Sequence, residues 1–408
     1  MNNRLKYIEK LLNGVQVGWK TLGDEKVGKF IRGCGLQKKD FTETGIGCIH
    51  YGQIYTYYGI YTDKTKSFVS EEFAKKTRKA KKGDLVVATT SENDEDVCKA
   101  VAWLGDDEIA VSSDACFYTH NLNPKYVAYF FQTELFQKQK RPFITGTKVR
   151  RVNADDLSKI LIPIPPLPVQ AEIVRILDSF TELTAELTAE LTARKKQYNY
   201  YREHLLSFKD GEVEWKTLGE ILIPKGYIRG PFGSALKKEF FVDEGIPVYE
   251  QQHAIYDNRN FRYFVTKDKA ISLKRFTVKP KDIIISCSGT IGKMSIINDK
   301  DEIGIINQAL LILRFDLLQI NVRYIKYYLE CFPDLIISSS GGAITNIEKR
   351  EVIEKIRIPI PPLEEQARIV YILDKFDTLT TSISEGLPKE IELRKKQYEY
   401  YRDKLLSF

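Results

Sequence analysis

The sequence predicts a mixed α/β protein made of two similar globular domains, each followed by a long helix. Three observations predict this class: the chain repeats several of its own segments, short β-branched runs alternate with helical patterns, and two amphipathic stretches continue for roughly forty residues. We expect globular domains at 1–161 and 209–357, and helices at 162–208 and 358–408. The two long helices should lie antiparallel as a coiled coil, with a pseudo-twofold relation between the halves of the chain.

The internal repeat is visible in four segments that occur twice. Two pairs are 196 positions apart and two are 200 apart, so the globular parts match in length and the second tail is longer by four residues. Such a repeat indicates one architecture used twice. The pairs are 19–23 (WKTLG) with 215–219, 162–167 (IPIPPL) with 358–363, 194–198 (RKKQY) with 394–398, and 205–208 (LLSF) with 405–408.

Between these segments the halves share a skeleton. A β-branched run after a turn, at 82–87 and again at 281–285, predicts a buried strand. The pattern at 124–129 and 322–327 predicts a helix with an aromatic face. The aromatic residues of that face are Tyr126, Tyr129 and Phe130 in the first half and Tyr324, Tyr327 and Tyr328 in the second. The surface residues differ between the halves, which is typical either of two different binding specificities or of neutral divergence.

The two long helices should start after the Pro-Pro pairs at 165–166 and 361–362, because proline fits just before or inside a helix start. Helices of forty residues measure about 60 Å and cannot bury their apolar stripes in a small domain, so we expect them to pack on each other. Gly386 and Pro388 should break or kink the second helix.

The first helix contains a perfect tetrapeptide repeat, which we interpret as a spacer. Its four-residue period drifts about 40° per step around a helix, so it does not form a coiled-coil seam. The repeat consists of Thr184, Ala185, Glu186, Leu187, Thr188, Ala189, Glu190 and Leu191.

Composition narrows the function classes. The 408 residues carry 62 Lys and Arg against 55 Asp and Glu, and the net charge of +7 suggests an anionic partner without requiring one. No apolar run is long enough to span a membrane and no signal-peptide core follows the start, so we expect a cytoplasmic protein without membrane contact. Six scattered cysteines and four histidines lack metal-ligand spacing, which predicts free thiols and neither a metal nor another cofactor.

The sequence shows no catalytic constellation. Residues 289–293 (GTIGK) look like half of a phosphate-binding loop, but Cys287 and Met294 stand where Gly and Ser or Thr are needed. Both Pro-Pro pairs are followed by leucine, so the Asn/Asp-Pro-Pro-Tyr/Phe motif for base methylation is missing. We therefore expect a non-catalytic chain.

Two variable domains, each followed by Ile-Pro-Ile-Pro-Pro-Leu-x-x-Gln-x-x-Ile-Val and a long helix, resemble the specificity subunit of type I restriction–modification enzymes. The tetrapeptide repeat and the two tails at 194–208 and 394–408 resemble the IC class of that family. The resemblance implies a non-catalytic subunit with two target recognition domains, each recognising one half of a split site in double-stranded DNA. It also implies two methyltransferase subunits, which bind S-adenosylmethionine and are carried by the helices, and restriction subunits that complete the complex.

Under this resemblance, basic residues on loops are candidates for phosphate contacts, although a lysine run is equally often a solvated surface. The candidates are Lys75, Lys76, Arg78, Lys79, Lys81, Lys82, Lys148, Arg150 and Arg151 in the first domain, and Lys237, Lys238, Arg262, Lys274, Arg275 and Lys293 in the second. Polar loop residues are candidates for contacts to base edges. They are Gln53, Tyr55, Tyr57, Ser91 and Lys99 in the first domain, and Arg229, Ser234, Gln251, Gln252, His253, Thr290 and Lys293 in the second.

The repeated basic cluster on the helices is either a solvated face or a docking face for the methyltransferase subunits. Its residues are Arg194, Lys195, Lys196 and Tyr198 in the first tail, and Arg394, Lys395, Lys396 and Tyr398 in the second. Two alternatives remain for the chain as a whole: the specificity subunit of a methyltransferase-only system, or a coiled-coil interaction scaffold unrelated to DNA. Steep salt dependence of DNA binding would separate the last from the others.

Overall fold

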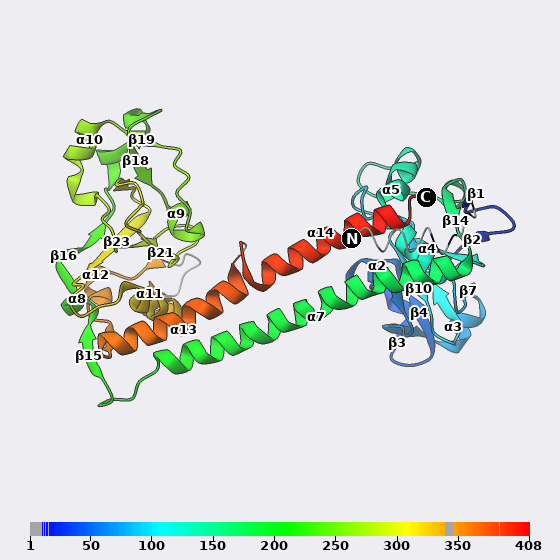
Figure 1. Ribbon diagram of the computed structural model, residues 1–408, viewed down its shortest axis with the longest axis horizontal. Coiled ribbons are helices and arrows are strands. Elements are labelled where there is room, and N and C mark those ends of the chain that lie inside the picture. Colours follow the sequence, from blue (N-terminus) through cyan, green and yellow to red (C-terminus); the bar gives the residue numbers. More distant parts are fainter. Residues whose placement is uncertain (1–9, 11, 13, 15, 339–345, 383) are drawn as a thin grey trace. The chain divides into compact units, whose positions relative to one another are not determined.

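The computed structural model describes residues 10, 12, 14, 16–338, 346–382 and 384–408. Its contacts divide the chain into two units: the first unit comprises 1–189 and 389–408, and the second unit comprises 190–388. Each unit therefore holds one globular domain and segments of two long helices, one of which comes from the other repeat (Figure 1).

The first unit contains two five-stranded sheets, ordered β2-β12-β8-β10-β5 and β3-β6-β4-β11-β7, and the two-stranded pairs β1-β14 and β13-β9. Its strands are β1 (Gly18–Thr21), β2 (Gly28–Arg32), β3 (Phe41–Thr42), β4 (Ile46–Ile49), β5 (Tyr61–Thr62), β6 (Ser67–Val69), β7 (Lys79–Ala80), β8 (Leu85–Ala88), β9 (Thr90–Ser91), β10 (Ala100–Trp103), β11 (Ile109–Val111), β12 (Ala115–His120), β13 (Arg150–Arg151) and β14 (Leu161–Ile164). Its helices are α2 (Tyr51–Thr56), α3 (Glu71–Lys75), α4 (Pro124–Phe130), α5 (Glu134–Lys140), α6 (Ala154–Leu157) and the first part of α7 (Leu167–Leu206), with 3-10 turns η1 (Lys38–Asp40) and η2 (Arg141–Phe143).

The second unit contains two four-stranded sheets, ordered β16-β23-β20-β21 and β17-β19-β18-β22, and the pairs β15-β26 and β24-β25. Its strands are β15 (Glu214–Thr217), β16 (Leu222–Arg229), β17 (Phe241–Val242), β18 (Ile246–Tyr249), β19 (Phe264–Val265), β20 (Ile283–Ser286), β21 (Met294–Ile296), β22 (Ile305–Ile306), β23 (Leu310–Phe315), β24 (Ile337–Ser338), β25 (Asn346–Ile347) and β26 (Arg357–Ile360). Its helices are α8 (Leu218–Ile221), α9 (Gln251–Tyr256), α10 (Lys267–Ser272), α11 (Val322–Cys331), α12 (Arg350–Ile353) and α13 (Leu363–Thr381), with 3-10 turns η3 (Gly233–Leu236), η4 (Lys238–Phe240), η5 (Lys274–Phe276) and η6 (Pro333–Leu335); α14 (Gly386–Leu405) follows and lies mainly in the first unit.

The repeated sequence segments are structural partners of each other. In the first unit β1 pairs antiparallel with β14, so that Trp19 lies opposite Pro163. In the second unit β15 pairs with β26 in the same way, and Trp215 lies opposite Pro359. Each two-stranded ribbon joins the two ends of its domain just before the long helix starts, which accounts for the repetition of both segments. The predicted repeat is thereby confirmed.

The predicted buried strands and aromatic helices are also present. The strands β8 and β20 are fully buried, and the tyrosines of α4 and α11 lie in the domain cores. The hydroxyl of Tyr126 donates to the carbonyl of Pro163 at 2.9 Å, and Tyr324 donates to Pro359 at the same distance. The two helices are therefore held against the ribbon by the same hydrogen bond in both units.

A buried glutamine fixes the start of each long helix. The side chain of Gln170 accepts from the backbone N–H of Asn123 and donates to the carbonyl of Pro165, both at 2.8 Å. Gln366 makes the equivalent bonds to Asn321 and Pro361, also at 2.8 Å. Because an amide buried without partners would cost about 1–3 kcal/mol, these bonds position the helix relative to its domain.

The two repeats differ in their long helices. The helix α7 is continuous over 40 residues, whereas the second repeat is divided into α13 and α14. Gly386 has φ +80°, a left-handed conformation that favours glycine, and Pro388 lies in the first turn of α14, where no backbone N–H is needed. The predicted break at Gly386 and Pro388 is confirmed.

Within each unit the two helix segments pack on each other through a stacked aromatic pair. Phe180 of α7 stacks on Tyr401 of α14 at 5.4 Å between ring centroids in the first unit, and Phe376 of α13 stacks on Tyr201 of α7 at 5.6 Å in the second. The first core also buries Leu405 and Leu406, which belong to the second repeat. The repeats thus exchange their helix tails: each domain is completed by the tail of the other repeat.

Among the described residues, no helix has the length and apolar content required to cross a bilayer. All six cysteines are free, and four of them are buried.

Candidate nucleic-acid interface

The helices α2 and α9 occupy equivalent places: α2 directly follows β4 of the sheet β3-β6-β4-β11-β7, and α9 directly follows β18 of the sheet β17-β19-β18-β22. In the first unit His50 caps α2: its Nδ1 accepts from the N–H of Gly52 at 3.2 Å, and its own N–H donates to Oε1 of Gln53 at 3.0 Å. In the second unit the N–H of Glu250 donates to Nδ1 of His253 at 2.7 Å. The same backbone geometry therefore carries different side chains in the two domains.

The predicted residues of the first domain gather around α2, β9 and β13. The Tyr55 hydroxyl donates to the carbonyl of Thr90 at 2.7 Å, and burial raises the pKa of this phenol. Ser91 of β9 lies opposite Arg150 of β13. Gln53 donates to Ser67 at 2.7 Å and is half-buried, so it mainly stabilises the turn around α2.

The remaining candidates of the first domain are more accessible. Tyr57 is 57% exposed, with the Lys66 ammonium 4.7 Å from its ring centroid. Lys148 and Arg151 are exposed, while Lys99 is half-buried. Arg150 forms an ion pair with Asp94 at 2.8 Å, so its charge is partly compensated within the protein.

In the second domain the candidates gather around the start of α9 and the loop after β20. Oε1 of Gln251 accepts from the Ser288 hydroxyl at 3.0 Å, and Gln252 is half-buried beside it. Thr290 and Lys293 are exposed in the same loop. Since β20 and β8 hold corresponding places in their sheets, this surface is the counterpart of the one around α2 and β9 in the first unit.

Burial argues against one predicted contact. His253 is fully buried, its Nδ1 accepts from Glu250, and its Nε2 lies 3.2 Å from the carbonyl of Asn260. Desolvation by burial lowers the pKa of this imidazole. A base-reading side chain must be accessible, so the prediction for His253 is corrected: this residue holds the loop that follows α9. Ser234 was also predicted, and its side chain lies outside the described residues.

Several predicted phosphate contacts are involved in ion pairs. In the run at 75–82, Lys76 pairs with Glu72, Lys79 with Glu108 and Lys82 with Asp106. In the second domain Arg262 pairs with Glu250 at 2.8 Å and Lys237 with Glu239 at 3.7 Å. These pairs favour the solvated-surface interpretation for much of the run. Exposed candidates for which the described residues show no ion pair are Lys75, Arg78, Lys81, Lys148, Arg151, Lys238, Lys274, Arg275 and Lys293.

The repeated cluster on the helices separates into two faces. Tyr198 stacks on Phe376 and is buried, and the Tyr398 hydroxyl donates to Gln132 at 2.8 Å, so both tyrosines attach a tail to a domain core. These contacts favour a structural role for both tyrosines, and their predicted role in docking stays a prediction. Arg194 and Arg394 pair with glutamates one turn earlier, Glu190 and Glu390, at 2.7 Å. The lysines 195, 196, 395 and 396 are exposed.

The exposed aromatic residues of the tails were not identified from the sequence. Tyr200 is 65% exposed and stacks on His204, and Tyr400 is 55% exposed and accepts from Lys404 at 3.2 Å. Tyr400 and Leu393 line a shallow groove on α14. The motif Tyr-x-Tyr-Tyr could have indicated this, because its first and last tyrosines share one helix face and the middle one lies on another.

A second missed residue is Arg32, an exposed arginine at the end of β2. The structure places Arg229 at the end of β16, the corresponding strand of the second unit. The signal was present in the sequence, because the tripeptide Ile-Arg-Gly occurs at 31–33 and again at 228–230.

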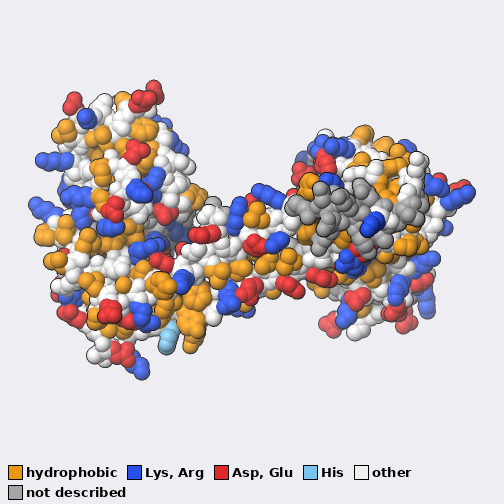
Figure 2. Space-filling model, in the orientation of Figure 1, with side chains coloured by type: hydrophobic (Ala, Val, Ile, Leu, Met, Phe, Trp, Pro, Cys, Tyr) orange, Lys and Arg blue, Asp and Glu red, His pale blue; other side chains and the backbone are white. Residues whose placement is uncertain are grey.

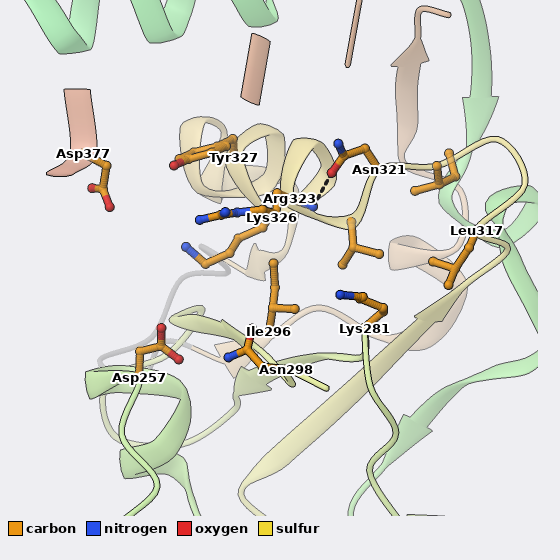
Figure 3. Close-up of a pocket in the computed structure, with 12 residues that line it drawn as sticks. Asp257, Lys281, Ile296, Asn298, Leu317, Asn321, Arg323, Lys326, Tyr327 and Asp377 are labelled. Atoms are coloured by element: carbon orange, nitrogen blue, oxygen red, sulfur yellow. Dashed lines mark hydrogen bonds between the residues drawn. The ribbon is translucent and has the colours of Figure 1, made fainter. Parts of the chain in front are cut away.

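One cavity in the second unit contains none of the predicted contacts. It measures about 520 Å³ in the second unit, between α11, β21 and the end of α9. Figure 3 shows Arg323 and Lys326 of α11 facing this space, with Asp257 and Asp377 at its border. In the first unit the edge strand β5 lies at the equivalent place, and the Lys125 ammonium lies 3.6 Å from the ring centroid of Tyr61. Among the described residues of the second unit, the sheet β16-β23-β20-β21 has no counterpart of β5. The cavity therefore reflects a missing edge strand.

Charges of both signs are mixed over the face seen in Figure 2. Within the part of the chain that the structure describes, no group of three His, Cys, Asp or Glu residues is arranged to hold a metal ion. The candidate interface therefore consists of local groups of polar and basic side chains at equivalent places in the two domains.

Comparison with known proteins by sequence profile, by sequence and by structure identifies the same family. The sequence profile described as "Type I restriction modification DNA specificity domain" matches residues 18–194 and again 213–393. The specificity subunit of the type I restriction enzyme EcoR124I/EcoR124II of Escherichia coli is 36% identical, over 100% of this chain and 98% of that protein. A putative type I restriction enzyme specificity subunit of Haemophilus influenzae is 31% identical over the full length of both. The crystal structure of the HsdS subunit from Thermoanaerobacter tengcongensis shares the fold, with a TM-score of 0.55, 18% identity, and 97% and 99% of the two chains covered.

Proposed function

Because the chain belongs to the family of type I restriction–modification specificity subunits, we propose that it recognises DNA for a complex whose catalytic groups lie in other subunits. Each domain recognises one half of a bipartite site in double-stranded DNA. The observation that carries this proposal is the use of one scaffold twice with different side chains at the equivalent candidate surfaces: Tyr51 and Gly52 begin α2, whereas Gln251 and Gln252 begin α9.

The long helices set the distance between the two half-sites. Support comes from α7, whose 40 residues form one uninterrupted helix of about 60 Å. The buried Gln170 and the paired strands β1 and β14 attach the start of this helix firmly to the first domain. A helix fixed at its start transmits both a length and a rotation to whatever is attached further along it.

The same helices dock two methyltransferase subunits, one on each tail, and restriction subunits join this complex to cleave unmethylated DNA. The exposed faces with Tyr200 and Tyr400 support two equivalent docking surfaces, because exposed tyrosines are typical anchors of protein interfaces. The exposed lysines 195, 196, 395 and 396 would form the rim.

The decisive experiment combines the purified chain with its methyltransferase partner and maps the adenines that become methylated. We expect no methylation by the chain alone, two partners per chain in the complex, and a motif split into two defined halves. A fully active complex with one partner per chain would contradict the proposed symmetry.

The docking surfaces are tested separately with Tyr200→Ala and Tyr400→Ala. Each substitution should weaken one of the two partner sites by roughly tenfold or more, the range typical of an aromatic anchor. The mass of the complex, measured as a function of partner concentration, would then show one partner retained. The matched control is Tyr256→Ala, which removes a tyrosine that is 73% exposed on the second domain.

A further inference from the structure

Arg32 and Arg229 occupy the same place in the two domains. Arg32 ends β2 and lies opposite Cys116 of β12, which in turn lies opposite Val87 of β8. Arg229 ends β16 in the same pattern, opposite Leu311 of β23, which lies opposite Ile285 of β20. The two arginines are 197 positions apart in the sequence and correspond strand by strand in the structure.

The residue after each arginine is a glycine for the same physical reason. A Cβ at Gly33 would lie 2.1 Å from the carbonyl oxygen of Ser112, and a Cβ at Gly230 would lie 1.9 Å from that of Asn307. Only glycine permits this approach of the two backbones. The Arg-Gly pair is therefore fixed in position at the end of the strand in both domains.

A second arginine accompanies each of them. In the first unit Nη1 of Arg78 donates to the carbonyl of Arg32 at 3.5 Å. In the second unit Arg275 and Arg229 line one pocket of about 370 Å³, together with Lys349, Arg350 and Glu348. Each domain thus presents a pair of arginines from the same two parts of its fold.

The pocket around Arg229 has an excess of positive charge. Arg350 is compensated by Glu354 at 2.8 Å, but the described residues provide no ion pair for Arg229, Arg275 or Lys349. Nη1 of Arg229 is buried and has no hydrogen-bond partner among the described residues. Burial raises the pKa of the neighbouring Cys287 thiol to about 11, so this thiol is neutral near pH 7 and supplies no counter-charge. An anion is the ligand that this pocket lacks.

The comparison of the two domains indicates which anion. Two domains that recognise different half-sites need different side chains for base contacts, but the sugar-phosphate backbone is the same at every half-site. Side chains at the start of α2 and α9 differ between the domains, whereas the Arg-Gly pair is identical. Identity at a basic position of two otherwise divergent surfaces is expected of a contact to the backbone.

We propose that Arg32 and Arg229 each bind a backbone phosphate of DNA, assisted by Arg78 and Arg275. This inference rests on the proposed function. It assigns to the pair a role in affinity and orientation, and leaves sequence discrimination to the divergent residues around α2 and α9.

The test uses the complex of the full chain with its methyltransferase subunits and two labelled duplexes, one with the mapped methylation motif and one of unrelated sequence. Binding is measured between about 50 and 200 mM salt. Arg32→Ala and Arg229→Ala should each weaken binding to both duplexes by the same factor, roughly tenfold. Each should also make the dependence of log K on log salt shallower by about 1, and the double variant by about 2.

The matched control is Lys300→Ala, which removes an exposed cation from the loop at the opposite end of the β20–β21 hairpin and should leave the slope unchanged. If Arg229→Ala unfolds the domain, the exposed Arg275→Ala is used instead, and Arg229→Lys should restore most of the salt dependence. Loss of affinity confined to the duplex with the motif would overturn the proposal in favour of base contacts, and so would a slope equal to that of the control. A wild-type complex without salt-dependent binding would instead refute the proposed function.

Discussion

At the scale of single residues, a tyrosine–aspartate pair joins a domain helix to a long helix in each unit. The Tyr129 hydroxyl donates to Oδ1 of Asp178 at 2.7 Å, and Tyr327 donates to Asp374 at the same distance. The charge of each aspartate is shared with a cation, Lys125 in the first unit at 2.9 Å. These bonds fix the angle at which the long helix leaves the domain.

We expect Tyr129→Phe and Tyr327→Phe each to destabilise their own unit by about 1–2 kcal/mol, because a hydrogen bond to a charged group is lost while the aspartate keeps its cation. Urea unfolding of the single variants measures this. Tyr200→Phe is the control, since its exposed ring should contribute nothing measurable through its hydroxyl. Unequal effects of Tyr129→Phe and Tyr327→Phe would show that the two junctions are not energetically equivalent.

His120 should make the first unit sensitive to acid. Desolvation by burial lowers the pKa of this imidazole to about 4, and its Nδ1 accepts from the N–H of Leu122 at 3.2 Å. Because an unfolded histidine titrates near 6.5, the contribution is complete above about pH 6.5 and is lost progressively as the pH falls to about 4. The loss should reach at most about 3 kcal/mol.

The pH dependence of unfolding, compared between the wild type and His120→Gln, measures this effect. The variant keeps an acceptor for the N–H of Leu122 but cannot be protonated, so its stability should fall less between pH 6.5 and 4. Some slope should remain, because burial also lowers the pKa of His50 and His253. Parallel curves for wild type and variant would contradict the assignment.

The burial and role of single residues were predictable from the sequence only where a local pattern determines the environment of the side chain. The burial of Tyr126 and Tyr324 follows from helical periodicity. The burial of His253 does not, because its position depends on Asn260 and on the cap at Glu250, which only the tertiary structure brings together. Arg32 was missed although Ile-Arg-Gly occurs in both halves, because a repeat of three residues is not significant by itself. It becomes significant only once the structure shows that β2 and β16 are equivalent strands.

At the scale of elements, the tetrapeptide repeat is an ordinary stretch of α-helix. The hydroxyls of Thr184 and Thr188 donate to carbonyls one turn earlier, to Phe180 at 2.8 Å and Thr184 at 2.7 Å, which satisfies these side chains within the helix. Leu187 and Leu191 are half-buried, and the alanine and glutamate residues are exposed. After removal of one repeat, the remaining leucines are therefore still half-buried and the remaining alanines and glutamates are still exposed.

Deleting residues 188–191 should leave both half-sites unchanged and shorten the gap between them by one base pair. One repeat accounts for about 6 Å and 40° of helix, and one base pair for about 3.4 Å and 34–36°, so the rotation matches one base pair while packed helices absorb the remaining translation. Mapping methylated sites in cells that carry the deletion measures the gap.

Deleting two residues is the matched control, because it turns the following helix by about 200° and should prevent assembly. An unchanged gap after the four-residue deletion would show that the spacing is determined elsewhere.

Elements were predicted well where sequence signals are local. The helix start after Pro166 and the break at Gly386 follow from the chemistry of proline and glycine. The edge strand β5 was not predicted, because two residues paired to a distant strand leave no periodic pattern. That the described residues of the second unit form no such strand, and leave a cavity in its place, likewise depends on pairing over long sequence distances.

At the scale of the whole molecule, the division of the chain into two domains predicts that each domain determines one half of the recognised DNA site. Replacing residues 24–160 with the corresponding domain of another specificity subunit should change one half of the recognised site and keep the other half. The physical reason is that the candidate contacts around α2, β9 and β13 lie within the exchanged segment and those around α9 lie outside it. Mapping of methylated motifs measures the outcome, and a change in both halves would contradict separate recognition.

The tandem architecture was predictable because repeated segments are visible without any structural knowledge. The exchange of tails was not: the aromatic stripe of 398–405 predicts that this helix is covered, but not that it packs against the first domain. Packing against the first domain depends on tertiary contacts such as that between Phe180 and Tyr401, which no local sequence pattern predicts.

The exchanged tails also determine the order in which the two domains can complete their folding during translation. The bonds from Tyr398 to Gln132 and from Glu134 to Asp403 join residues 266 and 269 positions apart. A ribosome has therefore translated almost the entire chain before the first domain can close its surface, whereas the second domain emerges after the tail it needs. The domain that is synthesised first therefore completes its fold last. A premature stop within the final twenty or so codons would destabilise the amino-terminal domain and leave the fold of the second domain intact.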